Sequence, residues 1–392
     1  MLKGKKILLA ICGSISFYKS YEIISQFKKM EAEIYVALSD GVLKFVNETS
    51  FEALSNHRVL SSKSYDWVEK VDHISYSKMD LVIIAPASAN TINKLANGIC
   101  DNEFMATLIA SHKIPTIITP AANNNMLDNV ATITSLEILQ ERGYHIIDPV
   151  EKILACGVSA KGGLCEVSDI VNLGIRLLLQ DNFYKNKNVI VTGGPTTEKI
   201  DDVRAITNFS SGKMAKALCD AFYYLGAEVK FISSVDFQTP YKMIKFESTT
   251  GLKSAIANLR LNNDDILIMC AAVSDYLPAR KSKGKLKKSD LGKNWSLPLV
   301  ENVDILMSLK NSKFTKIGFK LETDKENALK NAKNTLANKG LDAVCLNIID
   351  DKIKFGSNET MINFITRNGE ILIPKTQKLN AAFTIANLIK GF

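Results

Sequence analysis

The sequence has few of the residues that build disulfide frameworks, metal centres and membrane spans. Seven cysteines and four histidines are scattered over 392 residues, and no Cys-x-x-Cys pair occurs. This distribution argues against a disulfide framework or a structural zinc site and favours a reducing cytoplasm. The apolar run 7–12 imitates a signal peptide, but it is too short and no A-x-A-like cleavage site follows it. No later apolar run is long enough to cross a membrane, so we expect a cytoplasmic protein without a membrane partner.

Length and composition favour two globular domains. A chain of 392 residues is too long for one ordinary core, and its 46% hydrophobic and 23% charged residues are typical of globular proteins. A net charge of +8 permits anionic ligands. Seven basic residues crowd segment 280–293, which is more often a solvated loop than a binding site. That segment lacks interleaved aromatic residues, which counts against a nucleic-acid partner.

Short apolar runs alternate with amphipathic stretches in the first half, a pattern that predicts parallel strands under helices. The order favours a three-layer α/β sheet of flavodoxin-like or Rossmann-like type. The expected strands are 5–11, 33–38, 81–85, 116–119 and 144–147. The expected helices are 16–29, 89–97, 102–111 and 168–179.

The same α/β pattern restarts after the polar segment 180–188, which predicts a second, Rossmann-like domain. We therefore expect domains at 1–182 and 183–392. The expected strands are 189–192, 228–233, 266–270, 315–319 and 343–347. The expected helices are 213–225, 252–262, 303–309, 324–339 and 376–389. Arg367-Asn-Gly369 predicts a hairpin turn between 361–366 and 371–373.

Each half begins with a strand that runs into glycine and hydroxyl residues before a helix. The first such loop is Gly13-Ser-Ile-Ser16, and the second is Thr192-Gly-Gly-Pro-Thr196 followed by 208–213. Loops of this kind leave backbone N–H groups for a phosphate. The pattern G-x-G-x-x-G is absent after the first strand, which favours a mononucleotide over a dinucleotide. The second loop is not a Walker A motif, because Met214 replaces the required Ser or Thr.

Five motifs of the first half occur in an order that resembles the FMN-dependent phosphopantothenoylcysteine decarboxylases. They read Gly-Ser-Ile-Ser, Ser-Ala-Asn-Thr, Cys-Asp-Asn, Pro-Ala-x-Asn-x-x-Met and Ala-Cys-Gly. The resemblance implies a catalytic, base-like His73, a proton donor Cys156 on a flap, and contacts of Asn123 and Met126 to the substrate's carboxylate region. The residues it implies for FMN are Gly13, Ser14, Ile15, Ser39, Ser88, Asn90, Thr91 and Ala121.

The resemblance implies a decarboxylation in which flavin oxidation of the substrate's thiol supplies an electron sink, and Cys156 then protonates the enethiolate. Two motifs depart from the family pattern. Ala122 and Leu127 replace a Met and a Trp, and the flap lacks its usual Arg, for which Lys161 is a substitute candidate. These changes concern the substrate contacts of the flap more than the flavin chemistry.

Motifs of the second half resemble phosphopantothenate–cysteine ligase, which is commonly fused behind the decarboxylase in bacteria. The resemblance implies that CTP activates the carboxylate of 4′-phosphopantothenate as an acyl-cytidylate, which the amine of cysteine then attacks. It implies that Asn208 handles the acyl group, that Lys285 is catalytic, and that Ser211, Gly212 and Lys213 lie near phosphate. Asp275 is a candidate ligand for Mg²⁺ on a triphosphate. The nucleotide positions implied are Met269, Cys270, Ala271, Asp275, Lys285, Val303, Asp304, Ile305, Leu306, Phe319 and Lys339, with Lys333 as a shifted alternative to Lys339.

Both motif sets together predict a bifunctional enzyme of coenzyme A biosynthesis with FMN, Mg²⁺ and CTP. The resemblance also implies homo-oligomers, with trimeric flavin domains and dimeric ligase domains that together could build a dodecamer. Three alternatives remain at this stage. They are a chain with one inactive half, a flavoprotein regulatory subunit, and a nucleic-acid-binding protein that uses 280–293, which would bind with a steep salt dependence.

Overall fold

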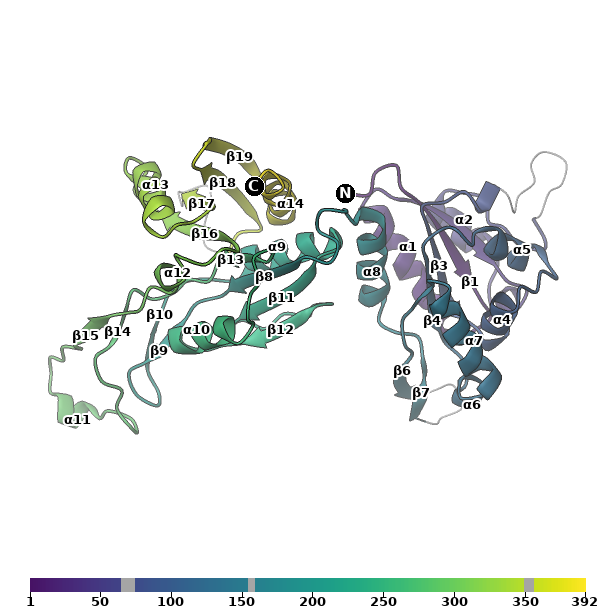
Figure 1. The fold of residues 1–392 in the computed structure, drawn as a ribbon. Helices are drawn as coiled ribbons and strands as arrows, with labels where there is room; N and C mark the ends of the chain where they lie inside the picture. Colours follow the sequence, from purple (N-terminus) through teal and green to yellow (C-terminus); the bar gives the residue numbers. More distant parts are fainter. Residues whose placement is uncertain (65–74, 154–158, 349–355) are drawn as a thin grey trace. The chain divides into compact units, whose positions relative to one another are not determined.

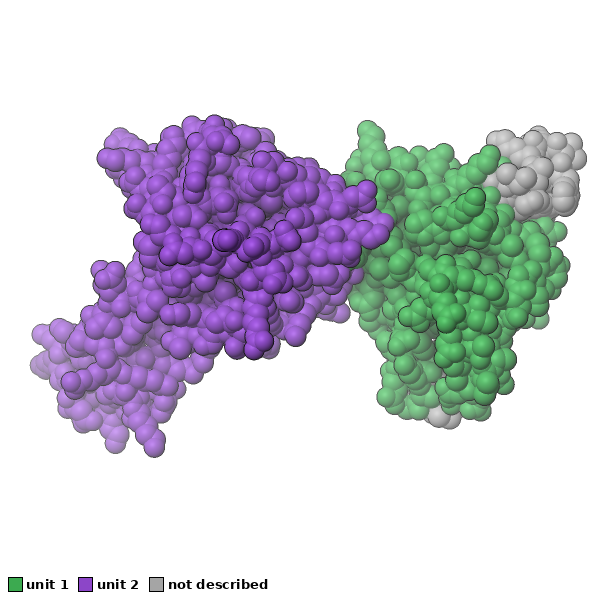
Figure 2. Space-filling view, viewed as in Figure 1, with its two compact units in different colours: residues 1–179 green, residues 180–392 purple. Residues whose placement is uncertain are grey.

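The computed structural model describes residues 1–64, 75–153, 159–348 and 356–392, and it divides into two compact units. Unit 1 comprises residues 1–179 and unit 2 residues 180–392, as coloured in Figure 2. In the described residues, no helix combines the length and the apolar content that a membrane span requires.

Unit 1 is built on a parallel five-stranded sheet with the order β2-β1-β3-β4-β5, of which Figure 1 labels β1, β3 and β4. This is the flavodoxin-like order, in which all strands are parallel and the order of strands along the sheet reverses between β1 and β3. The strands are β1 (Lys6–Ile11), β2 (Glu33–Leu38), β3 (Leu81–Ala87), β4 (Thr116–Pro120) and β5 (His145–Ile146). All five strands were expected from the apolar runs, because strands covered on both faces read as continuous apolar segments.

Helices cover both faces of this sheet, which completes three layers. Residues Leu8 and Ala10 of β1 face one apolar cluster with Ile92, Phe104 and Leu139 from three helices. On the other face α1 packs against α8, and α8 against β3 and β4. The helices are α1 (Lys19–Lys29), α2 (Thr49–Ser55), α4 (Ala89–Ala96), α5 (Glu103–Ala110), α6 (Asn124–Leu127), α7 (Val130–Glu141) and α8 (Val167–Leu179), with short 3₁₀ turns η1 (Ile15–Tyr18) and η2 (Val42–Lys44).

Unit 2 contains an eight-stranded sheet with the order β12-β11-β8-β13-β16-β17-β18-β19. The first six strands are parallel and follow the Rossmann order 3-2-1-4-5-6, whereas β18 and β19 are antiparallel and form the expected hairpin. The strands are β8 (Asn188–Gly193), β11 (Glu228–Ser233), β12 (Lys242–Lys245), β13 (Ile266–Met269), β16 (Thr315–Glu322), β17 (Ala343–Ile348), β18 (Glu359–Thr366) and β19 (Gly369–Gln377). The expected fold class is confirmed in both units.

Five helices cover the two faces of the second sheet. α9 packs against α14 over one face, while Leu252 of α10 and Ile305 of α12 join the apolar cluster on the other. The helices are α9 (Lys213–Tyr224), α10 (Thr249–Ala257), α12 (Ile305–Ser308), α13 (Ala328–Asn338) and α14 (Lys378–Ile389). The helix expected at 324–339 begins four residues later, because the Asp324 carboxylate accepts the N–H groups of Glu326 and Asn327 in a turn.

Three two-stranded ribbons project from the two sheets and were not expected from the sequence. β6 (Val150–Ile153) pairs with β7 (Ser159–Gly163) in unit 1. In unit 2, β9 (Thr197–Lys199) pairs with β10 (Ala205–Thr207), and β14 (Tyr276–Pro278) pairs with β15 (Leu299–Glu301). The segment between β14 and β15 holds α11 (Lys288–Leu291) and extends away from the sheet of unit 2 (Figure 1).

Candidate active sites

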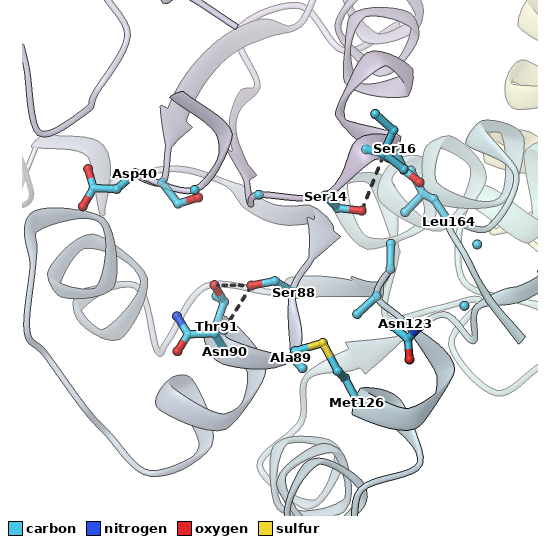
Figure 3. Close-up of a pocket in the computed structure, with 18 of the residues that line it drawn as sticks. Ser14, Ser16, Asp40, Ser88, Ala89, Asn90, Thr91, Asn123, Met126 and Leu164 are labelled. Atoms are coloured by element: carbon cyan, nitrogen blue, oxygen red, sulfur yellow. Dashed lines mark hydrogen bonds between the residues drawn. The ribbon is translucent and has the colours of Figure 1, made fainter. Parts of the chain in front are cut away.

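A cavity of about 780 Å³ lies at the carboxyl end of the sheet of unit 1, and we call it the β1 cavity. Loops after β1, β2, β3 and β4 form its wall, as ligand sites in open α/β sheets do. Its volume lies within the roughly 300–1,000 Å³ of small-molecule sites. All eight residues implied for FMN line it, together with Asn123 and Met126. Figure 3 labels Ser14, Ser88, Asn90, Thr91, Asn123 and Met126 among the lining residues.

Two loops of the β1 cavity touch backbone to backbone at Gly13 and Gly41. A Cβ atom on Gly13 would lie 2.7 Å from the carbonyl carbon of Gly41 and 2.8 Å from its Cα, distances that folded proteins do not tolerate. The Ser14 hydroxyl accepts the N–H of Ser16 and fixes the turn into η1. The N–H groups of Gly13 and Ile15 reach no acceptor in the described part of the chain, so both remain for a ligand.

Hydroxyl groups at the start of α4 form the polar floor of the β1 cavity. Ser88 caps this helix, because its hydroxyl accepts the N–H of Thr91 at 3.3 Å (Figure 3). The Thr91 hydroxyl in turn accepts from the Cys12 thiol at 3.2 Å. Burial raises the pKa of Cys12, so this thiol stays neutral and donates. The network holds the Ser88 and Thr91 hydroxyls in fixed positions.

Three large apolar side chains of the β1 cavity are exposed to solvent. Ile15, Tyr18 and Met126 are 55%, 60% and 51% exposed, although each belongs to the cavity wall. An exposed apolar patch inside a cavity marks a place where a ligand covers it. The β1 cavity thus combines hydroxyl and N–H groups with exposed apolar side chains. This combination suits a ligand with an anionic end and a flat aromatic end.

Two cavities of about 570 and 470 Å³ adjoin each other in unit 2. We call the larger one the α9 cavity, because residues 208–215 at the start of α9 line it. We call the smaller one the α12 cavity, because residues 301–306 line it. They share a wall of four residues, Ala271, Val273, Asp275 and Phe319. Two ligands in these cavities would therefore meet at this wall.

The α12 cavity collects nine of the positions implied for the nucleotide. These are Met269, Ala271, Asp275, Val303, Asp304, Ile305, Leu306, Phe319 and Lys339. Cys270 lines the α9 cavity instead, where burial raises the pKa of its thiol to about 12. Phosphate candidates Ser211, Gly212 and Lys213 also line the α9 cavity, together with Asn208, whose Nδ2 donates to the Val273 carbonyl at 3.1 Å.

Lys339 is the lysine that the structure places at the α12 cavity. Its ammonium lies 2.8 Å from Asp304, whose carboxylate also caps α12 by accepting the N–H of Met307. Burial alone would raise the pKa of Asp304, but the bonds from Lys339 and from backbone N–H groups lower it on balance. Lys333 lines neither cavity and lies 3.5 Å from Glu370.

Lys285 also lies outside both cavities, on the extended segment between β14 and β15. The neighbouring residues Gly284 and Leu286 donate their N–H groups to Asp202 and Asp201. Arg204 binds the Asp201 carboxylate at 2.6 Å and lies 5.2 Å from the Trp295 ring centre. The hydrogen bond from Arg204 lowers the pKa of Asp201 most. The structure thus fixes the backbone around Lys285 but leaves its side chain exposed.

Described residues contain no group of three or more His, Cys, Asp and Glu that could hold a metal ion. Asp275 is therefore a single carboxylate in the wall shared by both unit 2 cavities. Mg²⁺ in nucleotide sites is commonly held by one or two carboxylates together with phosphate oxygens. The arrangement fits a metal that arrives with a triphosphate and does not fit a metal held by protein ligands alone.

Two family models match the chain along nearly its whole length. Residues 1–179 match the model described as Flavoprotein, and residues 184–392 match the DNA/pantothenate metabolism flavoprotein C-terminal domain. A coenzyme A biosynthesis bifunctional protein CoaBC from Bacillus subtilis (strain 168) is 35% identical over 397 residues, covering 98% of this chain and 96% of the relative. The chain belongs to the family of coenzyme A biosynthesis bifunctional proteins.

Another relative of this family, from Escherichia coli (strain K12), is 32% identical and covers 96% of this chain and 94% of its own. Among solved structures, the crystal structure of the C-terminal domain of a CoaBC protein is 30% identical, with a TM-score of 0.44, covering 53% of this chain and 96% of that one. Family membership confirms the expected function, since the chain is an enzyme of coenzyme A biosynthesis with a phosphopantothenoylcysteine decarboxylase and a phosphopantothenate–cysteine ligase activity.

Sequence reasoning missed the lysines at the β1 cavity. Lys19, Lys94 and Lys152 line it, whereas Lys161 does not and instead lies 3.6 Å from Asp148. Lys152 stands on β6 opposite Ala160 of β7 and pairs with Glu166 at 2.7 Å. Lys152 was missed because the sequence analysis did not predict the β6–β7 ribbon, which carries this lysine to the cavity. His73 and Cys156 lie outside the described residues.

Proposed function

We propose that unit 1 binds FMN in the β1 cavity and decarboxylates phosphopantothenoylcysteine there, and that unit 2 makes this compound from 4′-phosphopantothenate, cysteine and CTP. The observation that carries the proposal is spatial. Positions drawn from four separate loops surround one cavity in unit 1, and nine nucleotide positions surround one cavity in unit 2. Two unlike cavities in two units fit two successive reactions.

Residues of the β1 cavity fit FMN by their chemistry. Ser14, Ser88 and Thr91 offer hydroxyls and the loop at Gly13 offers N–H groups, which suit a phosphate and polar ring edges. The exposed Ile15 offers an apolar surface to a flat ring. When bound, the flavin would supply the electron sink that decarboxylation of a cysteinyl carboxylate requires.

In this proposal Asn123, which lines the β1 cavity, holds the carboxylate that leaves as CO₂. Its Oδ1 accepts the N–H of Asn125 at 3.0 Å, and its amide NH₂ donates to no described residue, so it is available to a ligand. A neutral amide orients a carboxylate without the fixed positive charge that would stabilise it against decarboxylation. In this proposal Met126 contacts the substrate beside Asn123, His73 acts as the base-like residue near the flavin, and Cys156 returns a proton to carbon.

Unit 2 in this proposal activates the acid with CTP at the wall shared by its cavities, before the amine of cysteine displaces CMP. CTP occupies the α12 cavity, and the carboxylate of the acid reaches the α-phosphate at the shared wall to give the acyl-cytidylate and pyrophosphate. Asn208 stands there, because it lines the α9 cavity and donates to Val273 of the shared wall. Asp275 would hold Mg²⁺ on the triphosphate, and Lys285 would act in catalysis.

Flavin content tests the unit 1 proposal without any turnover. Purified protein should show the visible absorption of bound FMN, or gain it on incubation with FMN and retain it through gel filtration. FMN rather than FAD should be the flavin released on denaturation. A protein that remains colourless after reconstitution would contradict the assignment of the β1 cavity.

Nucleotide dependence tests the unit 2 proposal. Pyrophosphate release in the presence of 4′-phosphopantothenate should require CTP and Mg²⁺, and ATP should replace CTP poorly. Lys339→Met should raise the KM for CTP, whereas its matched control Lys333→Met should not, because Lys333 lines neither cavity. Equal effects of both substitutions would contradict the placement of CTP in the α12 cavity.

We also propose that the chain is cytoplasmic and forms homo-oligomers through both units. The support is the resemblance to a family with trimeric flavin domains and dimeric ligase domains, together with free cysteines at all six described positions. Sedimentation equilibrium of the full chain distinguishes a dodecamer from smaller assemblies. A monomer at micromolar concentration would contradict it.

A further inference from the structure

A buried carboxylate of unit 2 has no role in the reactions proposed above. Glu198 of β9 is 8% exposed, and no Lys, Arg or His of the described segments pairs with it. A buried charge without a counter-ion is costly, so its hydrogen-bond donors must stabilise it. We propose that Glu198 is a positioning residue for the nucleotide, because it fixes a wall of the α12 cavity through Thr249 and Asn302. This inference rests on the proposed function, which places CTP in that cavity.

The first link runs from Glu198 to the start of α10. Glu198 Oε1 accepts the Thr249 N–H at 2.9 Å and the Thr249 hydroxyl at 2.7 Å. Thr249 is the first residue of α10, where the N–H groups have no intrahelical acceptor and a carboxylate is favourable. An ionised carboxylate can only accept hydrogen bonds. The Thr249 hydroxyl therefore gives its single proton to Glu198 and keeps its lone pairs for another donor.

The second link is Asn302, which supplies that donor. Its Nδ2 donates to the Thr249 hydroxyl at 2.8 Å and to the Ser274 carbonyl at 2.7 Å. A flipped amide would face both acceptors with its oxygen and lose both bonds, so the network fixes its orientation. The backbone N–H of Asn302 also donates to the Asp275 carbonyl at 2.8 Å. Asn302 thereby holds two consecutive carbonyl groups, those of Ser274 and Asp275.

This network ends in the wall of the α12 cavity. Ser274, Asp275 and residues 301–306 line that cavity, whereas Glu198 and Thr249 line neither cavity of unit 2. In the proposed function Asp275 holds Mg²⁺ on the triphosphate. Hydrogen bonds behind a ligand-binding group set its orientation and so its affinity. Displacement of Asn302 would move the Ser274–Asp275 segment and the 302–304 loop together, and both face the nucleotide in this proposal.

Kinetics of the full chain test this positioning role. Glu198→Gln keeps the shape of the side chain and removes its charge. The KM for CTP in pyrophosphate release should rise on the order of tenfold, as when a charge-assisted hydrogen bond is lost. The KM for cysteine should change less than about twofold.

Two substitutions of Thr249 test the middle of the network. Thr249→Val removes the hydroxyl and should raise the KM for CTP as Glu198→Gln does, whereas Thr249→Ser keeps it and should retain most of the affinity. The double variant of Glu198→Gln and Thr249→Val should be no more than about twofold worse than the worse single variant, because both break one network. If Glu198→Gln does not fold, the contrast between Thr249→Val and Thr249→Ser decides the same question.

Asp265 provides the matched control for a merely structural role. It is 5% exposed in the same unit, and its carboxylate accepts Asn188 Nδ2 at 3.0 Å and the Asn262 N–H at 2.8 Å. It lines neither cavity of unit 2. Asp265→Asn and Glu198→Gln should both lower the midpoint of thermal unfolding, but only Glu198→Gln should change the KM for CTP by more than about twofold.

The inference is overturned if Glu198→Gln leaves the KM for CTP unchanged, or if Asp265→Asn raises it equally. Lys339 separates these outcomes from a failure of the proposed function, because it lines the α12 cavity directly. If Lys339→Met raises the KM for CTP and Glu198→Gln does not, the positioning role alone is wrong. If Lys339→Met has no effect on CTP, the nucleotide does not occupy this cavity, and both proposals are contradicted.

Discussion

In each unit a glycine at the end of the first strand lies too close to a neighbouring segment to carry a Cβ atom, but the neighbouring segments differ. Gly13 follows β1 and touches the backbone of Gly41 in another loop of the β1 cavity. Gly193 ends β8 and touches Ala215 of α9, where an added Cβ would lie 2.5 Å from the Ala215 Cβ. Gly13 therefore lets two loops of the β1 cavity lie together, whereas Gly193 lets helix α9 pack closely on its sheet.

This difference accompanies cavities at different positions in two sheets of related order. In unit 1 the loop after β1 lines the cavity directly. In unit 2 the loop after β8 bonds to the loop after β13, because Ala272 N–H donates to Gly194 and Thr196 N–H donates to Ala272. Residues that follow β13 line both cavities of unit 2, and Phe319 of β16 lies in their shared wall, whereas Gly193 and Gly194 line neither cavity. A related strand order thus does not imply an equivalent cavity position.

The largest expected effect tests the contact between Gly13 and Gly41. Gly13→Ala should abolish flavin retention, because the new Cβ meets backbone that cannot move without shifting the 39–41 loop. Gly41→Ala should weaken flavin binding less, since its Cβ would lie 3.2 Å from Gly13. Flavin absorption after gel filtration measures both. Ligase activity of unit 2 should persist in each variant, and its loss would show that the units are not independent.

A second prediction tests how unit 2 holds its extended segment. Asp201→Ala removes the acceptor for Arg204 and for the N–H of Leu286, so segment 280–293 should detach. Its exposed lysines should then be cleaved by trypsin faster, on the order of tenfold, because cleavage follows the population of the open form.

The exposed neighbour Asp202 provides the control for this experiment. Asp202→Ala removes a single bond, from the N–H of Gly284, and should accelerate cleavage much less. If Lys285 acts in catalysis, Asp201→Ala should also lower ligase activity while leaving the flavin spectrum unchanged. Equal proteolysis of both variants would contradict the role of the Asp201–Arg204 pair.

A third prediction compares two lysines of the β6–β7 ribbon. Lys152→Met should raise the KM of decarboxylation about threefold, because Lys152 lines the β1 cavity but shares its charge with Glu166. Lys161→Met should change it little, since Lys161 faces Asp148 outside the cavity. Steady-state rates with phosphopantothenoylcysteine decide between them. A larger effect of Lys161→Met would restore it as the replacement for the family's flap arginine.

The smallest expected effect compares two helix caps, one in each unit. Ser88→Ala and Ser248→Ala each remove a serine hydroxyl that accepts the N–H group three residues later, and each should cost about 1 kcal/mol of stability. Only Ser88 lines a cavity, so only Ser88→Ala should also weaken flavin binding. Denaturant titration and flavin titration of both variants provide the measurements. Equal flavin affinity in both would remove Ser88 from the site.

Sequence alone predicted the central sheets well because their strands are buried on both faces. The expected strand 33–38 coincides with β2 and 228–233 coincides with β11. The ribbons β9–β10 and β14–β15 were missed, because they are short and mostly exposed and so carry no apolar periodicity. Helix α7 was also missed, because its mixed surface gives a weak amphipathic pattern. Strand pairing, rather than local propensity, therefore defines the two ribbons.

The sequence predicted those cavity-lining residues that belong to loops at the carboxyl ends of parallel strands. The loop residues at 13–15 and 88–91 surround one cavity, as parallel strands require. The lysines were harder to predict, because a long side chain reaches a cavity through tertiary register that the sequence does not reveal. Lys152 reaches the β1 cavity from the β6–β7 ribbon, and Lys378 reaches the α9 cavity from the first turn of α14. The roles of Cys156, His73 and Lys285 stay predictions.

The most direct test of two successive reactions in one chain is a product analysis of Cys156→Ser. Supplied with 4′-phosphopantothenate, cysteine, CTP and Mg²⁺, the unchanged chain should yield 4′-phosphopantetheine, CMP and pyrophosphate. Cys156→Ser should consume CTP at the same rate but accumulate phosphopantothenoylcysteine, because the ligase cavities lie wholly in unit 2. Full formation of 4′-phosphopantetheine by Cys156→Ser would contradict the proton-donor role and the account built on it.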